Sequence, residues 1–173
     1  MTPMTTTGPK TFADLGLSEP VLRALADCGY QEPTPIQLAA IPLVSARRDV
    51  LATAQTGTGK TAAFMLPVIE DIAKRPKYAG DTPLALVLAP TRELALQIEE
   101  NVRAYGRYVG TRTAVLLGGV NSGPQIDKLR RGVDIVIATP GRLIDLVKQG
   151  AVSLADVEFL ILDEADRMLD LGF

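Results

Sequence analysis

Residues 54–61 bring together the residue types that surround the phosphates of a nucleotide. They read Ala-Gln-Thr-Gly-Thr-Gly-Lys-Thr and join the apolar run Val50-Leu51-Ala52 to a segment with helical periodicity. Glycine lets backbone N–H groups approach phosphate oxygens, Lys60 can reach the β- and γ-phosphates, and the Thr61 hydroxyl can hold Mg²⁺. The loop predicts a nucleoside triphosphate site. A glycine-rich turn that binds nothing is the competing interpretation, because Ala54 stands where the general pattern has glycine.

A second set of reactive residues follows the apolar run Phe159-Leu160-Ile161-Leu162, which leads directly into Asp163-Glu164-Ala165-Asp166. Carboxylates at the end of an apolar strand need a cation, so we expect Asp163 to hold Mg²⁺, directly or through water. Glu164 can then orient and deprotonate an attacking water, which indicates hydrolysis of a phosphoanhydride. The alternative is an acidic first turn that complements a helix dipole. The catalytic candidates are Lys60, Asp163 and Glu164, and the metal-binding candidates are Thr61 and Asp163.

The elements that must position these residues alternate along the chain between short apolar runs and helical patterns. The sequence predicts buried strands at 49–54, 84–89, 113–117, 134–139 and 158–163, and helices at 18–28, 34–46, 59–74, 91–105, 122–131 and 140–148. This alternation is typical of an α/β fold, a mostly parallel sheet flanked by helices with ligands at the carboxyl ends of the strands.

Composition limits the remaining possibilities. The chain has 173 residues, a formal net charge of −2, one cysteine and no histidine. Structural zinc sites and catalysis by a Ser-His or Cys-His pair need residues that it lacks. We expect residues 1–9 to form a flexible tail and residues 10–173 to form one domain. No segment has the length and apolarity of a membrane span, so we expect no membrane partner and a cytoplasmic location.

Together, Ala-Thr-Ala-Gln-Thr-Gly-Thr-Gly-Lys-Thr at 52–61 and Leu-Asp-Glu-Ala-Asp at 162–166 resemble the motifs of the DEAD-box ATP-dependent RNA helicases. That family also has alanine at the position of Ala54. The resemblance implies the N-terminal RecA-like P-loop NTPase domain, with ATP and Mg²⁺ as cofactors, and the general look is similar to bacterial helicases of the RhlE type.

The resemblance extends to an adenine-reading segment, residues 29–37, and to Phe12 upstream of it. In the family's arrangement the Gln37 amide reads a donor and an acceptor of adenine, while Tyr30 packs near the base. Residues 34–37 also read as a capping box, with Thr34 as the N-cap, and this alternative stays open. The implied nucleotide-binding residues are Phe12, Tyr30, Gln37, Ala54, Gln55, Thr56, Gly57, Thr58, Gly59, Lys60 and Thr61.

Three further segments resemble the family's RNA-facing motifs, and each follows an expected strand. Hydroxyls, glycine N–H groups, helix N-termini and guanidinium suit phosphate and ribose, so the implied partner is single-stranded or duplex RNA, held by its sugar-phosphate backbone without regard to sequence. Ordinary N-caps and turns are the alternative. The implied RNA-binding residues are Pro90, Thr91, Arg92, Gly118, Gly119, Thr139, Gly141 and Arg142.

The family pattern continues beyond these motifs with a Ser-Ala-Thr strand and a second RecA-like domain, and neither occurs in the 173 residues. The resemblance implies that this strand lies between the strand at 49–54 and the strand at 158–163, so the expected sheet is truncated before the motif III strand. We expect the chain alone to associate with itself and to be nearly inactive. The full protein would couple ATP hydrolysis to RNA unwinding or RNA–protein remodelling; the alternative is an inactive nucleotide- or RNA-binding module.

Overall fold

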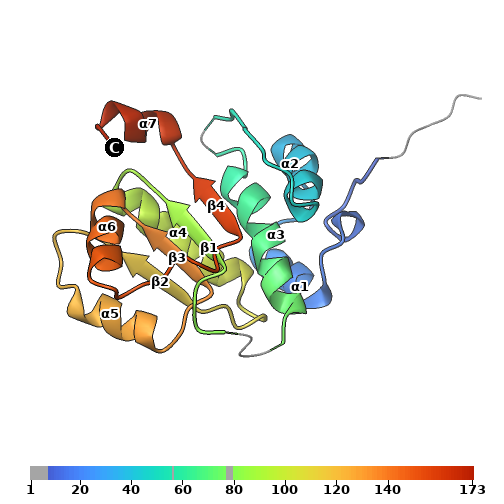
Figure 1. Ribbon diagram of the computed structural model, residues 1–173. Helices are drawn as coiled ribbons and strands as arrows, with labels where there is room; N and C mark the ends of the chain where they lie inside the picture. Colours follow the sequence, from blue (N-terminus) through green and yellow to red (C-terminus); the bar gives the residue numbers. More distant parts are fainter. Residues whose placement is uncertain (1–7, 56, 77–79) are drawn as a thin grey trace, which may run out of the picture. The chain divides into compact units, whose positions relative to one another are not determined.

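The computed structural model describes residues 8–55, 57–76 and 80–173 (Figure 1). Thr56 and all but two residues of the expected tail at 1–9 lie outside this description. The chain divides into two units. The first contains the residues up to Ala73 together with Tyr105–Val109, and the second contains Lys74–Ala104 and Gly110–Phe173.

The second unit is built on a sheet of four parallel strands. They are β1 (Ala85–Leu88), β2 (Thr113–Leu116), β3 (Ile135–Ala138) and β4 (Phe159–Leu162), in the order β2-β3-β1-β4. Every residue of β3 is buried, which explains why the sequence shows continuous apolar runs without alternation. The strand β4 lies at one edge, where Leu160 and Leu162 are 60% and 50% exposed.

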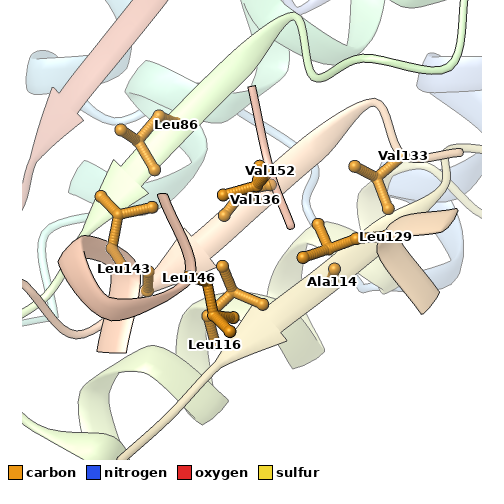
Figure 2. Close-up of a cluster of buried hydrophobic side chains, with 10 residues drawn as sticks. Leu86, Ala114, Leu116, Leu129, Val133, Val136, Leu143, Leu146 and Val152 are labelled. Atoms are coloured by element: carbon orange, nitrogen blue, oxygen red, sulfur yellow. The ribbon is translucent and has the colours of Figure 1, made fainter. Parts of the chain in front are cut away.

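Helices cover both faces of this sheet. One face is covered by α5 (Gly123–Arg130) and α6 (Pro140–Lys148), whose buried side chains pack with those of the strands. Figure 2 shows this cluster, which includes Leu116, Val136 and Leu146. The helix α4 (Arg92–Tyr105) lies on the opposite face. A hydrogen bond of 3.3 Å connects it to the sheet, from the hydroxyl of Thr113 in β2 to Glu99 Oε1 in α4. A short helix, α7 (Ala165–Asp170), follows β4.

The first unit is helical. It contains a 3₁₀ turn, η1 (Ala13–Leu15), and the helices α1 (Glu19–Asp27), α2 (Pro35–Ser45) and α3 (Lys60–Lys74), the last residue of which belongs to the second unit. The start of α1 is tied to α3, because the backbone N–H and the hydroxyl of Ser18 both donate to Glu70 Oε2, at 3.0 and 2.9 Å. This carboxylate satisfies a backbone donor at the N-cap and so fixes where the helix begins.

Most of the expected elements are confirmed. All six expected helices and four of the five expected strands are present, and the sheet is parallel as expected. The expected strand at 49–54 is wrong, since these residues form no strand and Leu51 is 97% exposed. An apolar run becomes a strand only where a neighbouring strand pairs with its backbone, and the observed sheet contains no such partner for it. The sequence reading also missed η1 and α7.

Within the described ranges, no helix combines the length and the apolar character that crossing a membrane requires.

We predict that Leu146→Ala lowers the free energy of unfolding by about 2–5 kcal/mol, because it opens a cavity in the cluster of Figure 2. Leu146 is 0% exposed, whereas Ile144 on the same helix is 53% exposed. The matched control Ile144→Ala should therefore change the free energy by no more than about 0.5 kcal/mol. Urea unfolding of both variants measures the difference, and equal losses would contradict the packing described.

Candidate functional site

The expected phosphate-binding loop, residues 54–61, lies in the first unit, and two glycines allow its turn. Gly57 and Gly59 have φ of +83° and +82°, a region that side-chain-bearing residues rarely adopt. The hydroxyl of Thr58 donates to the Gln55 carbonyl at 2.8 Å, which closes the loop on itself. The helix α3 begins at Lys60, so Lys60 and Thr61 stand in its first turn, both partly exposed. Thr56, also expected in this loop, lies outside the described residues.

The start of α2 contacts this loop through its N-cap, Thr34, and its third residue, Gln37. The Thr34 hydroxyl donates to the Thr58 carbonyl at 2.8 Å, and Gln37 Nε2 donates to the Gly59 carbonyl at 3.1 Å. A Cβ atom added at Gly59 would lie 2.3 Å from Gln37 Nε2. The loop and the first turn of α2 therefore fit together only because position 59 has no side chain.

Gln37 also makes the contact expected of a capping box, because its Oε1 accepts the backbone N–H of Thr34 at 3.0 Å. The side chain is almost fully enclosed, with 2% exposed. The two bonds use one N–H and one oxygen lone pair of an amide that has two of each. The capping interpretation is thus observed, while the adenine contact of Gln37 stays a prediction for which the amide keeps one donor and one acceptor.

The two aromatic residues expected near the base stack on each other. The rings of Phe12 and Tyr30 are 6.5 Å apart and inclined by 23°, and the Tyr30 hydroxyl lies 2.9 Å from the hydroxyl of Tyr105. Burial, together with this hydrogen bond, raises the pKa of Tyr105 far above its ordinary value, so the Tyr105 phenol stays protonated. Sequence reasoning missed Tyr105, because it is 75 positions from Tyr30 in the sequence and no local pattern connects the two.

In the second unit the register of the strands aligns their carboxyl ends. Leu88 of β1 pairs with Ala138 of β3 and with Leu162 of β4, and Ala138 also pairs with Leu116 of β2. One residue further, the N–H of Asp163 donates to the Leu88 carbonyl at 3.0 Å. The residues that follow the four strands therefore all lie along one edge of the sheet, which we call its carboxyl-terminal edge.

The acidic pair at this edge has an unusual backbone. Glu164 is the N-cap of α7 and adopts a left-handed conformation, with φ 51° and ψ 50°. Its Oε2 lies 3.5 Å from Arg167 Nη1, a pair with more than a third of each side chain exposed. Non-glycine residues in this conformation are uncommon and concentrate at functional sites. The turn directs the chain away from β4 immediately after Asp163.

The expected RNA-binding residues after β1 and β2 approach one another. The Thr91 hydroxyl accepts the N–H of Leu94 at 3.3 Å, so Thr91 acts as an N-cap at the start of α4. Arg92 is exposed, and a Cβ atom added at Gly119 would lie 3.5 Å from its Nη1. Gly119 itself has φ of +75°. Pro90, which precedes Thr91, is buried.

The expected residues after β3 stand at the start of α6. Thr139 is its N-cap, its hydroxyl donates to the Leu116 carbonyl at 3.5 Å, and Gly141 is exposed in the first turn. Arg142 donates from Nη1 to Gln125 Oε1 at 3.2 Å and from Nη2 to the Val120 carbonyl at 3.0 Å, with only 13% of its side chain exposed. Sequence reasoning missed Gln125, which no motif marked.

Comparison with known proteins agrees with this geometry. A family model described as DEAD/DEAH box helicase matches residues 34–173. The chain belongs to this family. It is 48% identical over 165 residues to the "DEAD-box ATP-dependent RNA helicase 30" of Arabidopsis thaliana, covering 95% of this chain and 28% of that protein. It is 45% identical over 169 residues to the human "Probable ATP-dependent RNA helicase DDX23", covering 95% of this chain and 21% of that protein.

Membership of the DEAD/DEAH box helicase family confirms the resemblance and, with the four-stranded parallel sheet, the RecA-like α/β fold class. A third relative, the "ATP-dependent RNA helicase dbp2" of Aspergillus clavatus, is 47% identical over 165 residues, which are 95% of this chain and 30% of that protein. The chain thus spans less than a third of the length of these relatives. The RhlE-type resemblance and the individual roles of the site residues stay predictions.

We predict that Gly59→Ala destabilises the chain more than Gly57→Ala does. Both positions have positive φ, which costs alanine about 1 kcal/mol or more. Only at Gly59 would the new Cβ also displace Gln37, breaking its bond to the loop, whereas nothing lies within 4 Å of a Cβ at Gly57. Thermal unfolding without nucleotide measures the two losses, and equal shifts in midpoint would show that Gln37 does not clamp the loop.

Proposed function

We propose that this chain is the ATP-binding domain of an RNA helicase that couples ATP hydrolysis to RNA unwinding or RNA–protein remodelling. The observation that carries the proposal is the shared edge of the sheet in the second unit. Asp163 emerges there beside groups suited to phosphate, namely the N-termini of α4 and α6 and the loop at Gly119. Asp163, proposed for ATP hydrolysis, and the residues proposed for RNA binding lie at this same edge, after strands that pair with one another. A change in one group can therefore alter the other through the strands that connect them.

Lys60 and the N–H groups of its loop are suited to binding the phosphates of ATP, and Gln37 to reading adenine through its remaining donor and acceptor. Glu164 would orient the attacking water and accept its proton. Thr61 and Asp163 would hold Mg²⁺, which neutralises charge on the phosphates when bound. The donor types fit, because Mg²⁺ takes one or two protein oxygens together with phosphate and water. The described residues contain no group of three or more Cys, Asp or Glu side chains placed to hold a metal without a nucleotide.

RNA would be held through its sugar-phosphate backbone. Thr91, Arg92, Gly119 and Gly141 present hydroxyl, guanidinium and backbone N–H groups, and the exposed Arg92 is the charged member. Contacts of this kind fix position and orientation without reading base edges. We therefore expect similar affinity for RNAs of different sequence at one salt concentration.

The whole protein's activity would need a second RecA-like domain in addition to the residues described here. In support, the matched relatives are more than three times as long as the aligned part of this chain. We infer that the 173-residue chain by itself associates through β4, which is an edge strand of the described sheet and has Leu160 and Leu162 exposed. Cytoplasmic location stays a further prediction.

ATP and ADP should stabilise the chain in a thermal shift experiment with Mg²⁺. A ligand at one hundred times its dissociation constant stabilises by about 2.7 kcal/mol. GTP should give a clearly smaller shift, because guanine offers the wrong partners to the Gln37 amide. Gln37→Glu should reduce the preference for adenine, since a carboxylate loses the donor. Equal shifts by ATP and GTP in the unaltered chain would count against Gln37 as the reader of the base.

Glu164→Gln in the full-length protein should lower the turnover number for ATP by about 10²–10⁴, because a general base is lost, while ATP binds as before. Steady-state phosphate release and equilibrium binding of a fluorescent ATP analogue measure the two quantities. Glu100→Gln, an exposed position on α4, is the matched control and should change neither. Unchanged turnover in Glu164→Gln would remove Glu164 from the mechanism, and an unaltered protein without turnover would favour the inactive binding module.

A further inference from the structure

The loop between β2 and α5 is tied to the rest of the second unit at two carbonyls, one on each side of the glycine pair. Before the pair, the Leu117 carbonyl accepts Gln125 Nε2 at 3.1 Å. After the pair, the Val120 carbonyl accepts Arg142 Nη2 at 3.0 Å. The two ties are joined to each other, because Arg142 Nη1 donates to Gln125 Oε1 at 3.2 Å.

This arrangement uses both ends of the Gln125 amide. Its NH₂ group donates to the Leu117 carbonyl of the loop, and its oxygen accepts from the guanidinium of Arg142, which in turn donates to the Val120 carbonyl. A side chain that could only donate or only accept would not replace it. Gly118 and Gly119 have more backbone freedom than any other residue type, and Gly119 uses that freedom with φ of +75°. Because glycine does not select one conformation, the conformation observed must be fixed by neighbouring groups.

The position of Arg142 supports the same conclusion. The side chain is 13% exposed, and two of its nitrogen atoms donate to the loop and to Gln125. The third, Nε, lies 3.9 Å from Asp145 Oδ2. The guanidinium is directed at the protein, in contrast to that of the exposed Arg92.

We propose that Gln125 is a positioning residue that, together with Arg142, holds the Gly118–Gly119 loop in the conformation that binds RNA phosphates. The inference rests on the proposed RNA-binding function. We call the hydrogen-bonded pair Gln125 and Arg142 the brace. A loop held in its bound conformation loses less entropy on binding, so the brace raises the affinity for RNA without contacting RNA. Arg142 then contributes to RNA binding through the loop and not as a direct phosphate contact.

The first test needs no RNA. Gln125→Met keeps the length of the side chain and removes both hydrogen bonds, so amide hydrogen exchange at residues 118–121 of the full-length protein should become about fivefold faster or more. Gln97→Met, at an exposed position of α4, is the matched control and should leave exchange in the loop unchanged. Unchanged exchange in Gln125→Met would overturn the proposal.

The second test measures the binding of a fluorescein-labelled oligouridylate by anisotropy over a range of salt concentrations. Gln125→Met should raise the dissociation constant about fivefold with the same salt slope, because no phosphate contact is lost. Arg142→Lys should cause a similar loss, since lysine keeps the charge but lacks the two-pronged geometry. The double variant should lose no more than either single variant, because both act through one brace.

The outcomes separate the inference from the proposed function. If the unaltered protein does not bind the oligouridylate, the RNA function fails, although faster exchange would still support the brace. If it binds and Gln125→Met loosens the loop without weakening binding, the positioning role is wrong. Full affinity in Arg142→Lys, or losses that add in the double variant, would likewise contradict a shared brace. A salt slope lowered by about 0.7 in Arg142→Met would instead indicate a direct phosphate contact.

Discussion

The register of the parallel ladder is the constraint on which the second unit depends. Strands that run in one direction and share a register must end at one edge, and Leu88, Leu116, Ala138 and Leu162 stand in one such row. Segments that are up to 74 residues apart in the sequence, such as those after Leu88 and Leu162, are thereby brought to one line. The buried apolar side chains of the sheet favour that register, since a slip would disrupt their packing against the helices that cover both faces. The alignment of the candidate functional residues after the four strands is thus a consequence of core packing.

The first unit uses a different device, a polar side chain buried against a loop. Burying an amide costs free energy unless it is hydrogen-bonded, and Gln37 has partners at Thr34 and Gly59. Because the carbonyl of Gly59 also accepts the N–H of Ala63 at 3.1 Å, the first turns of α2 and α3 both bond to this one carbonyl. A side chain that reads the base and a loop that holds the phosphates would then move together. Capping and recognition are compatible roles for one amide.

Much of the site could be predicted from the sequence because its members lie in contiguous motifs with local geometry. Glycine turns, N-caps such as Thr91 and apolar runs that end in carboxylates are all properties of a few neighbouring residues. The failures involve partners that are distant in the sequence. Residues 49–54 have the composition of a strand, but a strand forms only where a neighbouring strand pairs with its backbone. Tyr105 and Gln125 contact residues that no local sequence pattern connects to them. Left-handed Glu164 also went unforeseen, because no side-chain property marks it.

Thr91, Thr139 and the loop at Gly119 lie at the carboxyl-terminal end of the sheet, but their conformations are stabilised in different ways. This difference explains why the loop alone depends on a residue that belongs to no sequence motif. Thr91 and Thr139 stand at helix N-termini, where the helix itself sets the direction of the N–H groups. The loop at Gly119 has no such internal support, since glycine permits many conformations and helix α5 begins only at Gly123. Its shape must come from outside, and the carbonyls of Leu117 and Val120 are where Gln125 and Arg142 supply it. Each carbonyl is bonded by a side chain of a different helix, Gln125 of α5 and Arg142 of α6, so no local sequence pattern marks the pair.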